Sequence, residues 1–220
     1  MMFLSLFKES LPSLLTGLAV TLKLAIFSII IACVIGVIIG LLGISKNKIL
    51  RGISTVYTYL IRGTPLIVQG LFLYFGLGAL FAMRFDPIKA GILVLSLNAG
   101  AYLSEIFRGG ILAVDNGQME AARSLGLNYP KAMVLIVLPQ AFKIMIPSIL
   151  NQFIITVKDT SILSVIGIRE LTQSGQIIIA RNYKTFELYA MVALMYLILI
   201  TVLSLISKLV EKKLSYGIKA

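Results

Sequence analysis

Residues Leu24–Gly43 read LAIFSIIIACVIGVIIGLLG, twenty residues without a charged side chain. About 20 consecutive apolar residues are enough for a helix to cross the hydrocarbon core of a bilayer. Lys23 directly precedes this stretch, and a lysine at such a place can extend its side chain towards the membrane surface. The stretch therefore predicts a membrane-spanning helix, and the rest of the chain has to be compatible with a membrane fold.

The composition of the whole chain agrees with a membrane protein. Of 220 residues, 59% are hydrophobic and 13% are charged, and the mean hydropathy is +0.99. A soluble protein averages about 45–50% apolar residues, so this excess cannot be buried in one water-soluble core. The charged residues also form clusters between long uncharged runs. We therefore expect lipid to be the solvent of much of the surface, and a single membrane domain over residues 1–220.

Four further stretches are long and apolar enough to be spans, which gives five in all. They are Gly63–Met83, Ile88–Phe107, Ile144–Val157 with an extension to Thr160, and Leu188–Ser207. The segment 162–187 is apolar too, but Arg169, Glu170 and Arg181 interrupt it, so we expect a packed interfacial helix or a partial re-entrant segment there. The first ten residues lack the features of a signal peptide and are interpreted as a short interfacial segment.

The lysines and arginines outside the spans predict the orientation, because cytoplasmic loops carry more of them. The first loop, the third loop and the C-terminal end hold 12: Lys46, Lys48, Arg51, Arg62, Arg108, Arg123, Lys131, Lys143, Lys208, Lys212, Lys213 and Lys219. The N-terminal end and the other two loops hold 7: Lys8, Arg84, Lys89, Lys158, Arg169, Arg181 and Lys184. The N-terminus is therefore predicted outside, and the C-terminus and the loop Arg108–Lys143 in the cytoplasm.

The net charge of +11 would suggest nucleic acid as a partner of a soluble protein. In a membrane protein, basic residues belong to cytoplasmic loops and to anionic lipid headgroups, so we expect membrane lipid and no nucleic acid as partner. The chain has no histidine, and its one cysteine, Cys33, lies in an apolar run. No metal site, thiol chemistry or cofactor bound by this chain is expected.

The third loop contains a short predicted helix with recognisable ends. Asp115 or Asn116 can cap a helix over about Met119–Leu125. Gly126 suits the left-handed residue that ends such a helix, and Pro130 suits the first turn of the next one. The sequence therefore predicts a small helix beneath the membrane, between spans 3 and 4. The residues alone are equally compatible with an ordinary amphipathic connector.

Four stretches resemble one protein family, in the right order and over nearly the whole chain. They are Arg62–Gln69 (RGTPLIVQ), Ala101–Gly110 (AYLSEIFRGG), Glu120–Gly126 (EAARSLG) followed by Leu138 and Pro139, and Val157–Ser161 (VKDTS). The third resembles the EAA loop of ABC importer permeases. The others look like the polar amino-acid branch of these permeases, which includes histidine, glutamine and arginine permeases. The chain thus resembles the transmembrane subunit of a type I ABC importer.

The resemblance implies an all-α membrane fold and a set of partners. In such permeases the loop helix is a coupling helix that docks on a cytoplasmic ATPase. Two membrane chains, identical or similar, work with two ABC ATPase subunits and an extracytoplasmic amino-acid-binding protein in the inner membrane of a bacterium or archaeon. On this analogy the coupling residues are Glu120, Ala121, Ala122, Ser124 and Gly126. The chain has no G-x-x-x-x-G-K-[ST] phosphate loop, so ATP and Mg are expected on the partner subunits and no enzyme activity here.

Polar side chains within the predicted spans suggest a substrate route, because intramembrane charges are costly and face a cavity or a partner. On the third span, Asn98, Tyr102 and Glu105 share one helical face. Near the outer end of the fourth, we expect Lys158 to contact the carboxylate of an amino acid and Asp159 its ammonium or a basic side chain. The complete predicted substrate-binding set is Asn98, Tyr102, Glu105, Lys158, Asp159, Thr160 and Ser161.

Three of these residues also have a structural alternative. Glu105 can pair with Arg108 and hold two helices together, and Lys158 and Asp159 can pair with each other or mark the outer interface. The stretch Arg62–Pro65 is predicted to begin the second span on the cytoplasmic side, where Pro65 suits a first helical turn. Its resemblance to the family's motif implies a structural or gating element.

Other functions remain open for the chain as a whole. The alternative transporter is a secondary one driven by an ion gradient, which would show inverted repeats; the sequence shows no repeat. A membrane enzyme would need a nucleophile–base pair or metal ligands, and a scaffold would leave Asn98 and Asp159 unexplained. Among substrates, the basic amino acids arginine, lysine and histidine are favoured over acidic ones because of Asp159.

Overall fold

The computed structural model describes the backbone of residues 2–215 and the side chains of residues 6–213. Over this range the chain is helical and has no β-strand. The helices are α1 (Met2–Gly43), α2 (Lys48–Arg62), α3 (Leu66–Leu71), α4 (Leu77–Leu80), α5 (Pro87–Leu112), α6 (Asn116–Ser124), α7 (Tyr129–Ala132), α8 (Leu138–Asp159), α9 (Leu171–Asn182) and α10 (Thr185–Ser215). The π-helical turns η1 (Phe72–Gly76) and η2 (Met133–Val137) join α3 to α4 and α7 to α8, and the 3-10 helix η3 (Thr160–Ile166) follows α8.

The all-α fold with about five membrane crossings is confirmed. Four helical stretches are long and apolar enough to cross a membrane: Leu6–Gly43, Pro87–Leu112, Tyr129–Ile166 and Thr185–Lys213. A fifth crossing exists if α2 and the stretch Leu66–Leu80 count together as one span. The stretches Leu6–Gly43 and Tyr129–Ile166 extend well beyond their predicted bounds, because the helices continue past the apolar core of each.

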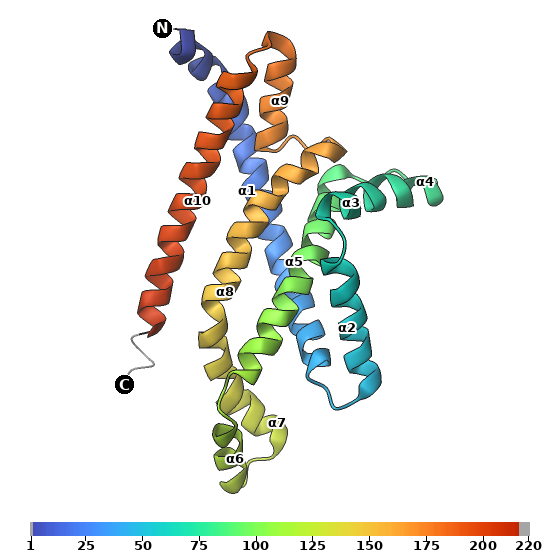
Figure 1. Ribbon diagram of the computed structural model, residues 1–220, viewed down its shortest axis with the longest axis vertical. Coiled ribbons are helices and arrows are strands. Elements are labelled where there is room, and N and C mark those ends of the chain that lie inside the picture. Colours follow the sequence, from blue (N-terminus) through green and yellow to red (C-terminus); the bar gives the residue numbers. More distant parts are fainter. Residues whose placement is uncertain (1, 216–220) are drawn as a thin grey trace.

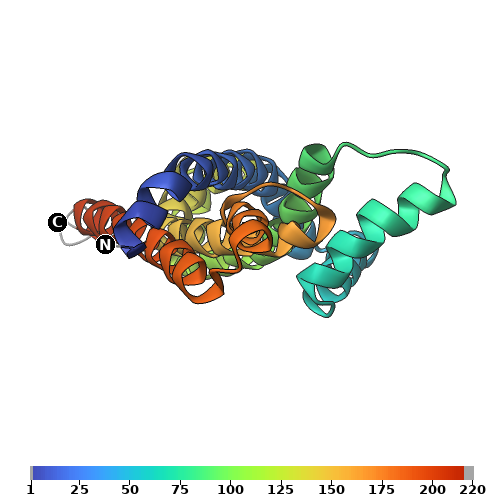
Figure 2. The same ribbon diagram turned by 90° about the horizontal axis from the view of Figure 1, so that it is seen from above.

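The sequence predicts the second span at Gly63–Met83, and this prediction is wrong. The chain bends by 100° between α2 and α3, and the arm formed by α3, η1 and α4 projects sideways from the other helices (Figures 1 and 2). Pro65 has no N–H and disfavours helical backbone at the residue before it, so it favours a break at this position. Apolar residues follow the bend, which is why hydropathy alone merges the arm into a span.

The first ten residues, predicted as a short interfacial segment, belong from Met2 on to the first helix, and their position at a membrane interface stays a prediction. The helix α1 runs without interruption from Met2 for 42 residues. Its first part has a protein partner: Leu14 is fully buried against Leu171 of α9 and Leu188 of α10, and Phe7 packs on the same cluster. This apolar packing explains why the segment continues the helix.

The segment 162–187 contains a packed helix. A packed helix was one of the two predictions for this segment, and a partial re-entrant segment was the other. Gly167 ends η3 with φ of +80°, a conformation that favours glycine, and α9 follows. The carboxylate of Glu170 caps α9 by accepting hydrogen bonds from the N–H groups of Thr172 (2.9 Å) and Gln173 (2.7 Å). It also accepts one from the hydroxyl of Tyr196 on α10 (2.8 Å). The desolvation that accompanies its burial raises the pKa of Glu170.

The centre of the bundle is the contact between α1 and α5. A side-chain Cβ added at Gly36 or Gly40 of α1 would lie 2.7 Å from the Cβ of Leu103 or 2.9 Å from the carbonyl oxygen of Ser104. Small residues thus let the two helices approach closely, as is common between helices in membranes. The core continues from Leu103 and Phe107 to Met145 of α8.

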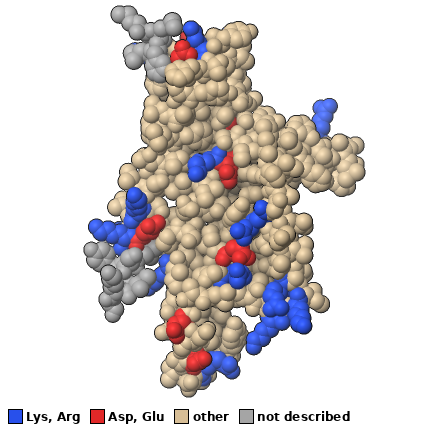
Figure 3. Space-filling model, in the orientation of Figure 1, with Lys and Arg blue, Asp and Glu red and all other residues tan. Residues whose placement is uncertain are grey.

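The two ends of the chain lie at opposite ends of the bundle, as an odd number of crossings requires. In Figure 1 the start of α1 lies at the top beside α9, whereas α6 and the end of α10 lie towards the bottom. Basic side chains gather at the lower end of the face shown in Figure 3, over the start of α2 and beside the end of α10. This distribution agrees with a cytoplasmic lower end, which stays a prediction; Lys219 of the charge count lies outside the described residues.

Candidate functional site

A polar hollow of about 580 Å³ lies where α2, α3, α5 and α8 meet. Its lining residues come from the bend after α2 and from the facing sides of α5 and α8: Arg62, Gly63, Thr64, Pro65, Leu66, Asn98, Tyr102, Gln152, Ile155 and Asp159. We call this space the central hollow. Of the predicted substrate-binding set, it brings together Asn98, Tyr102 and Asp159.

The wall formed by the bend is held by the side chain of Gln69. Its Nε2 donates hydrogen bonds to the carbonyl oxygens of Ile61 (2.7 Å) and Thr64 (3.0 Å), and lies 3.0 Å from the hydroxyl of Thr64. Its Oε1 accepts a hydrogen bond from Nδ2 of Asn98 (3.1 Å). The break in the helix frees carbonyl groups that need donors, and Gln69 supplies them. The same residue thereby positions Asn98 at the edge of the hollow.

Arg62 brings a positive charge to the hollow from the end of α2. Its guanidinium carbon lies 5.1 Å from the centre of the Tyr102 ring, within the range of a cation–π interaction. The positive charge of Arg62 and the negative charge of Asp159 thus line one space, although no ion pair joins the two among the described side chains. Sequence reasoning placed Arg62 only at a span boundary; its position directly before the Gly63–Pro65 break was the available clue.

Gln152 is a second lining residue that sequence reasoning missed. It is 5% exposed and lies seven residues before Asp159 on α8, so the two share one helical face two turns apart. That spacing was visible in the sequence, since two polar residues seven positions apart lie on the same side of a helix. Together with Asn98, Gln152 gives the hollow two neutral amides that can both donate and accept hydrogen bonds.

The other residues of the predicted set lie outside the lining of the central hollow. Lys158 is exposed. Thr160 is fully buried and donates to the carbonyl oxygen of Val157 (2.8 Å), and Ser161 donates to that of Lys158 (2.7 Å). These hydroxyl groups are satisfied by their own helix turn. A substrate role for the three residues stays a prediction that this geometry does not favour.

Glu105 pairs with Arg108, which is the alternative that the sequence left open. The Arg108 Nη2 lies 2.8 Å from Glu105 Oε2. The expectation that this pair would hold two helices together is wrong, because both residues lie on α5, three positions apart. A pair at this spacing stabilises its own helix.

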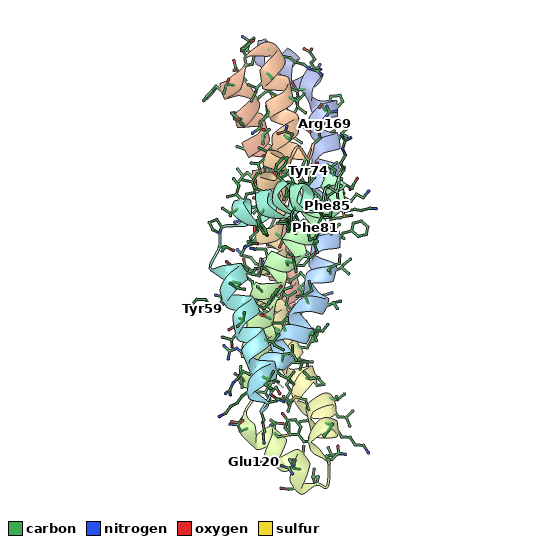
Figure 4. The ribbon with its side chains drawn as sticks, turned by 90° about the vertical axis from the view of Figure 1, so that its right-hand side faces the viewer. Tyr59, Tyr74, Phe81, Phe85, Glu120 and Arg169 are labelled. Carbon is green, nitrogen blue, oxygen red and sulfur yellow. The ribbon has the colours of Figure 1, made fainter. Side chains whose placement is uncertain are left out.

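The predicted loop helix is confirmed and begins three residues earlier than expected. The helix α6 runs over Asn116–Ser124, and Oδ1 of its cap Asp115 accepts a hydrogen bond from the N–H of Gly117 (2.7 Å). Gly126 has φ of +87°, and Pro130 lies in the first turn of α7, as the sequence predicts. Figure 4 shows Glu120 at the far end of the molecule from Arg169.

The predicted coupling residues differ in their exposure to solvent. Glu120, Ala121, Ser124 and Gly126 are exposed, whereas Ala122 is only 4% exposed and packs towards the protein. Leu125, outside the predicted set, is 85% exposed at the tip of the loop. Leu125 directly follows the last residue of α6. The side-chain hydrogen bond from Gln140 to Gln118 (3.1 Å) ties α6 to α8.

Comparisons with known proteins agree with this architecture. Residues 32–216 match the family described as "Binding-protein-dependent transport system inner membrane component". The chain is 41% identical over 204 residues to the arginine transport system permease protein of Bacillus subtilis, covering 93% of both chains. It is 38% identical over 206 residues to the glutamine transport system permease protein of Escherichia coli K12, covering 93% of this chain and 94% of the relative.

Solved structures show the same fold. The crystal structure of an amino acid ABC transporter with histidines is similar with a TM-score of 0.91 and 39% identity, over 96% of this chain and 98% of that chain. The MetNI methionine ABC transporter, in an inward-facing conformation, has a TM-score of 0.79 at 19% identity, which shows a shared fold alone.

Proposed function

Because the chain belongs to the family of inner membrane components of binding-protein-dependent transport systems, we propose that it forms the amino-acid pathway of an ATP-driven importer. The relatives named for arginine and glutamine transport, and the solved amino acid ABC transporter, support an amino acid as the transported substrate. Their organisms support the cytoplasmic membrane of a bacterium as the location. The central hollow supplies the chemistry for the proposal.

The observation that carries the proposal is the presence of one cation and one anion in the central hollow. An amino acid presents a carboxylate and an ammonium group a short distance apart. The guanidinium of Arg62 offers a planar donor pair that matches a carboxylate, and the carboxylate of Asp159 matches an ammonium group. Arg62 therefore takes the part that the sequence assigned to Lys158. The amides of Asn98 and Gln152 add neutral hydrogen bonds, which suit a polar side chain.

The substrate is proposed to be a polar amino acid, with basic ones favoured over acidic ones. The lining holds a single carboxylate, that of Asp159, and a single guanidinium, that of Arg62. The carboxylate and ammonium of the substrate satisfy both. Asp159 can bind a basic side chain as well as an ammonium group, and the relative named for arginine transport supports this preference.

Energy for transport is proposed to enter at α6. The exposed residues Glu120, Ala121, Ser124, Leu125 and Gly126 form the surface for an ATPase subunit, which binds the ATP and Mg. A pair of membrane chains, identical or similar, would bind two such subunits and receive substrate from an extracytoplasmic binding protein. Transport then proceeds by alternating access, in which ATP and the binding protein shift the equilibrium because each favours one of the two states.

The decisive experiment is to co-purify the chain with its cognate ATPase and binding protein in vesicles, and to screen amino acids for uptake and for stimulated ATP hydrolysis. Uptake of polar amino acids that requires ATP supports the proposal. Uptake that persists without the ATPase and follows an ion gradient would contradict it and support a secondary transporter.

A further inference from the structure

A second polar hollow lies at the end of the bundle opposite α6, between the start of α1 and α9. Its volume is about 350 Å³, and its polar lining residues are Glu9, Ser10, Ser13, Arg169, Arg181 and Asn182. We call it the outer hollow. It shares no lining residue with the central hollow, so substrate passage through the bundle does not explain it.

The outer hollow carries a net charge of +1. Arg169 precedes α9 and Arg181 lies in its last turn, and both line the hollow with Glu9 of α1. Within the described side chains, neither arginine has a carboxylate oxygen within 4.0 Å. Two guanidinium groups without contact partners at one concave site are suited to an oxyanion, because their donors match phosphate and carboxylate geometry.

An unsatisfied hydroxyl group also lines the outer hollow. Ser10 is 3% exposed, and its Oγ is the one buried side-chain oxygen or nitrogen within the described residues that has no hydrogen-bond partner. A buried hydroxyl without a partner costs free energy, and in folded proteins such groups call for an explanation. Ser10 is a lining residue of the hollow, and rotation of its side chain would let the hydroxyl group, which is buried and unsatisfied, bond to an oxygen atom bound there.

We infer that the outer hollow binds a phosphodiester group, the singly charged oxyanion of phospholipid headgroups. One negative charge neutralises the net charge of the hollow, whereas the second charge of a phosphate dianion would be repelled by Glu9. The remaining wall is apolar, formed by Ile177 and Ile178, and Leu15 further along α1 is 49% exposed. A molecule with an anionic head and an apolar tail therefore fits better than a free anion.

The test measures phospholipid retained by the purified full-length chain, by native mass spectrometry in detergent with added phosphatidylglycerol. The variant is Arg169→Gln with Arg181→Gln. The control is Arg84→Gln with Lys89→Gln, which removes the same charge at exposed positions outside the hollow. Because two charge-assisted hydrogen bonds are lost, retention should fall by at least about tenfold in the variant and stay unchanged in the control. Equal retention in both, or an equal loss in both, would overturn the inference.

Two further measurements keep the test decisive. Ser10→Ala preserves every charge, so it should retain less phosphatidylglycerol without a lower unfolding temperature when lipid is absent. Retention like that of the unchanged chain would mean that the hydroxyl has no ligand. Glycerophosphoglycerol, which is the phosphodiester headgroup without acyl chains, and inorganic phosphate should not raise the unfolding temperature. If either does so as strongly as the lipid, a soluble phosphate is the ligand and the lipid assignment is wrong.

Discussion

The helical chain is broken in two places by a glycine and a proline, and the two breaks are built differently. At Gly126, before Pro130, the break has a positive φ and open space around the glycine. At Gly63, before Pro65, φ is −84°, and an added Cβ would lie 2.6 Å from the carbonyl oxygen of Tyr59. The break at Gly126 needs glycine for its left-handed backbone conformation. The break at Gly63 needs glycine because the carbonyl oxygen of Tyr59 lies where a side chain would begin.

The surroundings of the two breaks explain their different uses. The turn at Gly126 lies at the exposed end of a loop, where the N–H groups of Gly126 and Leu127 donate to the carbonyl oxygens of Arg123 and Ala122. The bend at Gly63–Pro65 is held by the side chain of Gln69, which joins it to Asn98 and the central hollow. A helix break inside an apolar region leaves backbone groups that need hydrogen-bond partners. Here the partner is the side chain of Gln69, which also positions a residue of the central hollow.

Removing the side chain that holds the bend at Gly63–Pro65 should have the largest effect on stability. In Gln69→Leu, the carbonyl oxygens of Ile61 and Thr64 lose their donor, and Asn98 loses its acceptor. At about 1 kcal/mol for each hydrogen bond, the free energy of unfolding in mixed micelles should fall by about 2–3 kcal/mol, and substrate binding should weaken. Gln173→Leu on α9 is the matched control, because its backbone N–H rather than its side chain takes part in the cap. Equal stability of the two variants would mean that Gln69 does not hold the bend.

Gly63→Ala tests the close approach at the same bend. The added methyl group would meet the Tyr59 carbonyl oxygen at 2.6 Å, so backbone has to move, at a cost of about 1–3 kcal/mol. Gly70→Ala, at a buried helical position with no atom within 4 Å of the added Cβ, should not be destabilised. Thermal unfolding of both variants measures the difference, and a stable Gly63→Ala chain would contradict the proposed crowding.

Gly126→Ala should have a smaller effect, because only the backbone conformation is affected. A positive φ costs an alanine about 1 kcal/mol, whereas Gly109→Ala, at an exposed position inside α5, should gain about that amount from helix propensity. The two variants should therefore shift the unfolding temperature in opposite directions. A bulkier residue at Gly126 should also reduce the coupling of ATP hydrolysis to uptake; full coupling would count against docking of the ATPase at this loop.

Leu125→Ser should leave stability almost unchanged, because the side chain is 85% exposed. If the tip of α6 contacts the ATPase, the variant should bind that subunit more weakly, by about 1–2 kcal/mol for the loss of a buried leucine. Co-purification of the two subunits at increasing dilution measures this. The control is Leu112→Ser, at a leucine that is 63% exposed before α6 begins; an equal loss in both variants would remove the special role of Leu125.

The sequence was sufficient for features whose physical cause is local. Charge-free runs of about 20 residues predict spans, and Asp115, Gly126 and Pro130 predict the ends of α6 because caps and turns depend on near neighbours. The shared face of Asn98 and Tyr102 follows from helical spacing. Apart from the span predicted at Gly63–Met83, these features are present in the structure.

The rest depended on contacts between residues far apart in the chain. The bend after Arg62 was hidden because apolar residues follow Pro65, and hydropathy does not distinguish a sideways arm from a span. Arg62 and Gln152 are 90 residues apart in the sequence and meet only because α2 and α8 border the same hollow. The outer hollow likewise needs the start of α1 to pack beside α9, and no pattern in the sequence indicated that contact.

Arg62 and Asp159, rather than Lys158, are proposed to bind the carboxylate and the ammonium group of the amino acid. The most direct test is uptake by vesicles that contain the chain, its ATPase and its binding protein, with ATP hydrolysis followed in parallel. Arg62→Gln and Asp159→Asn should each weaken substrate affinity by about tenfold or more, as expected for the loss of a charge-assisted hydrogen bond, while Lys158→Gln transports normally. Unchanged affinity and flux in Arg62→Gln or Asp159→Asn, or a loss confined to Lys158→Gln, would contradict the account.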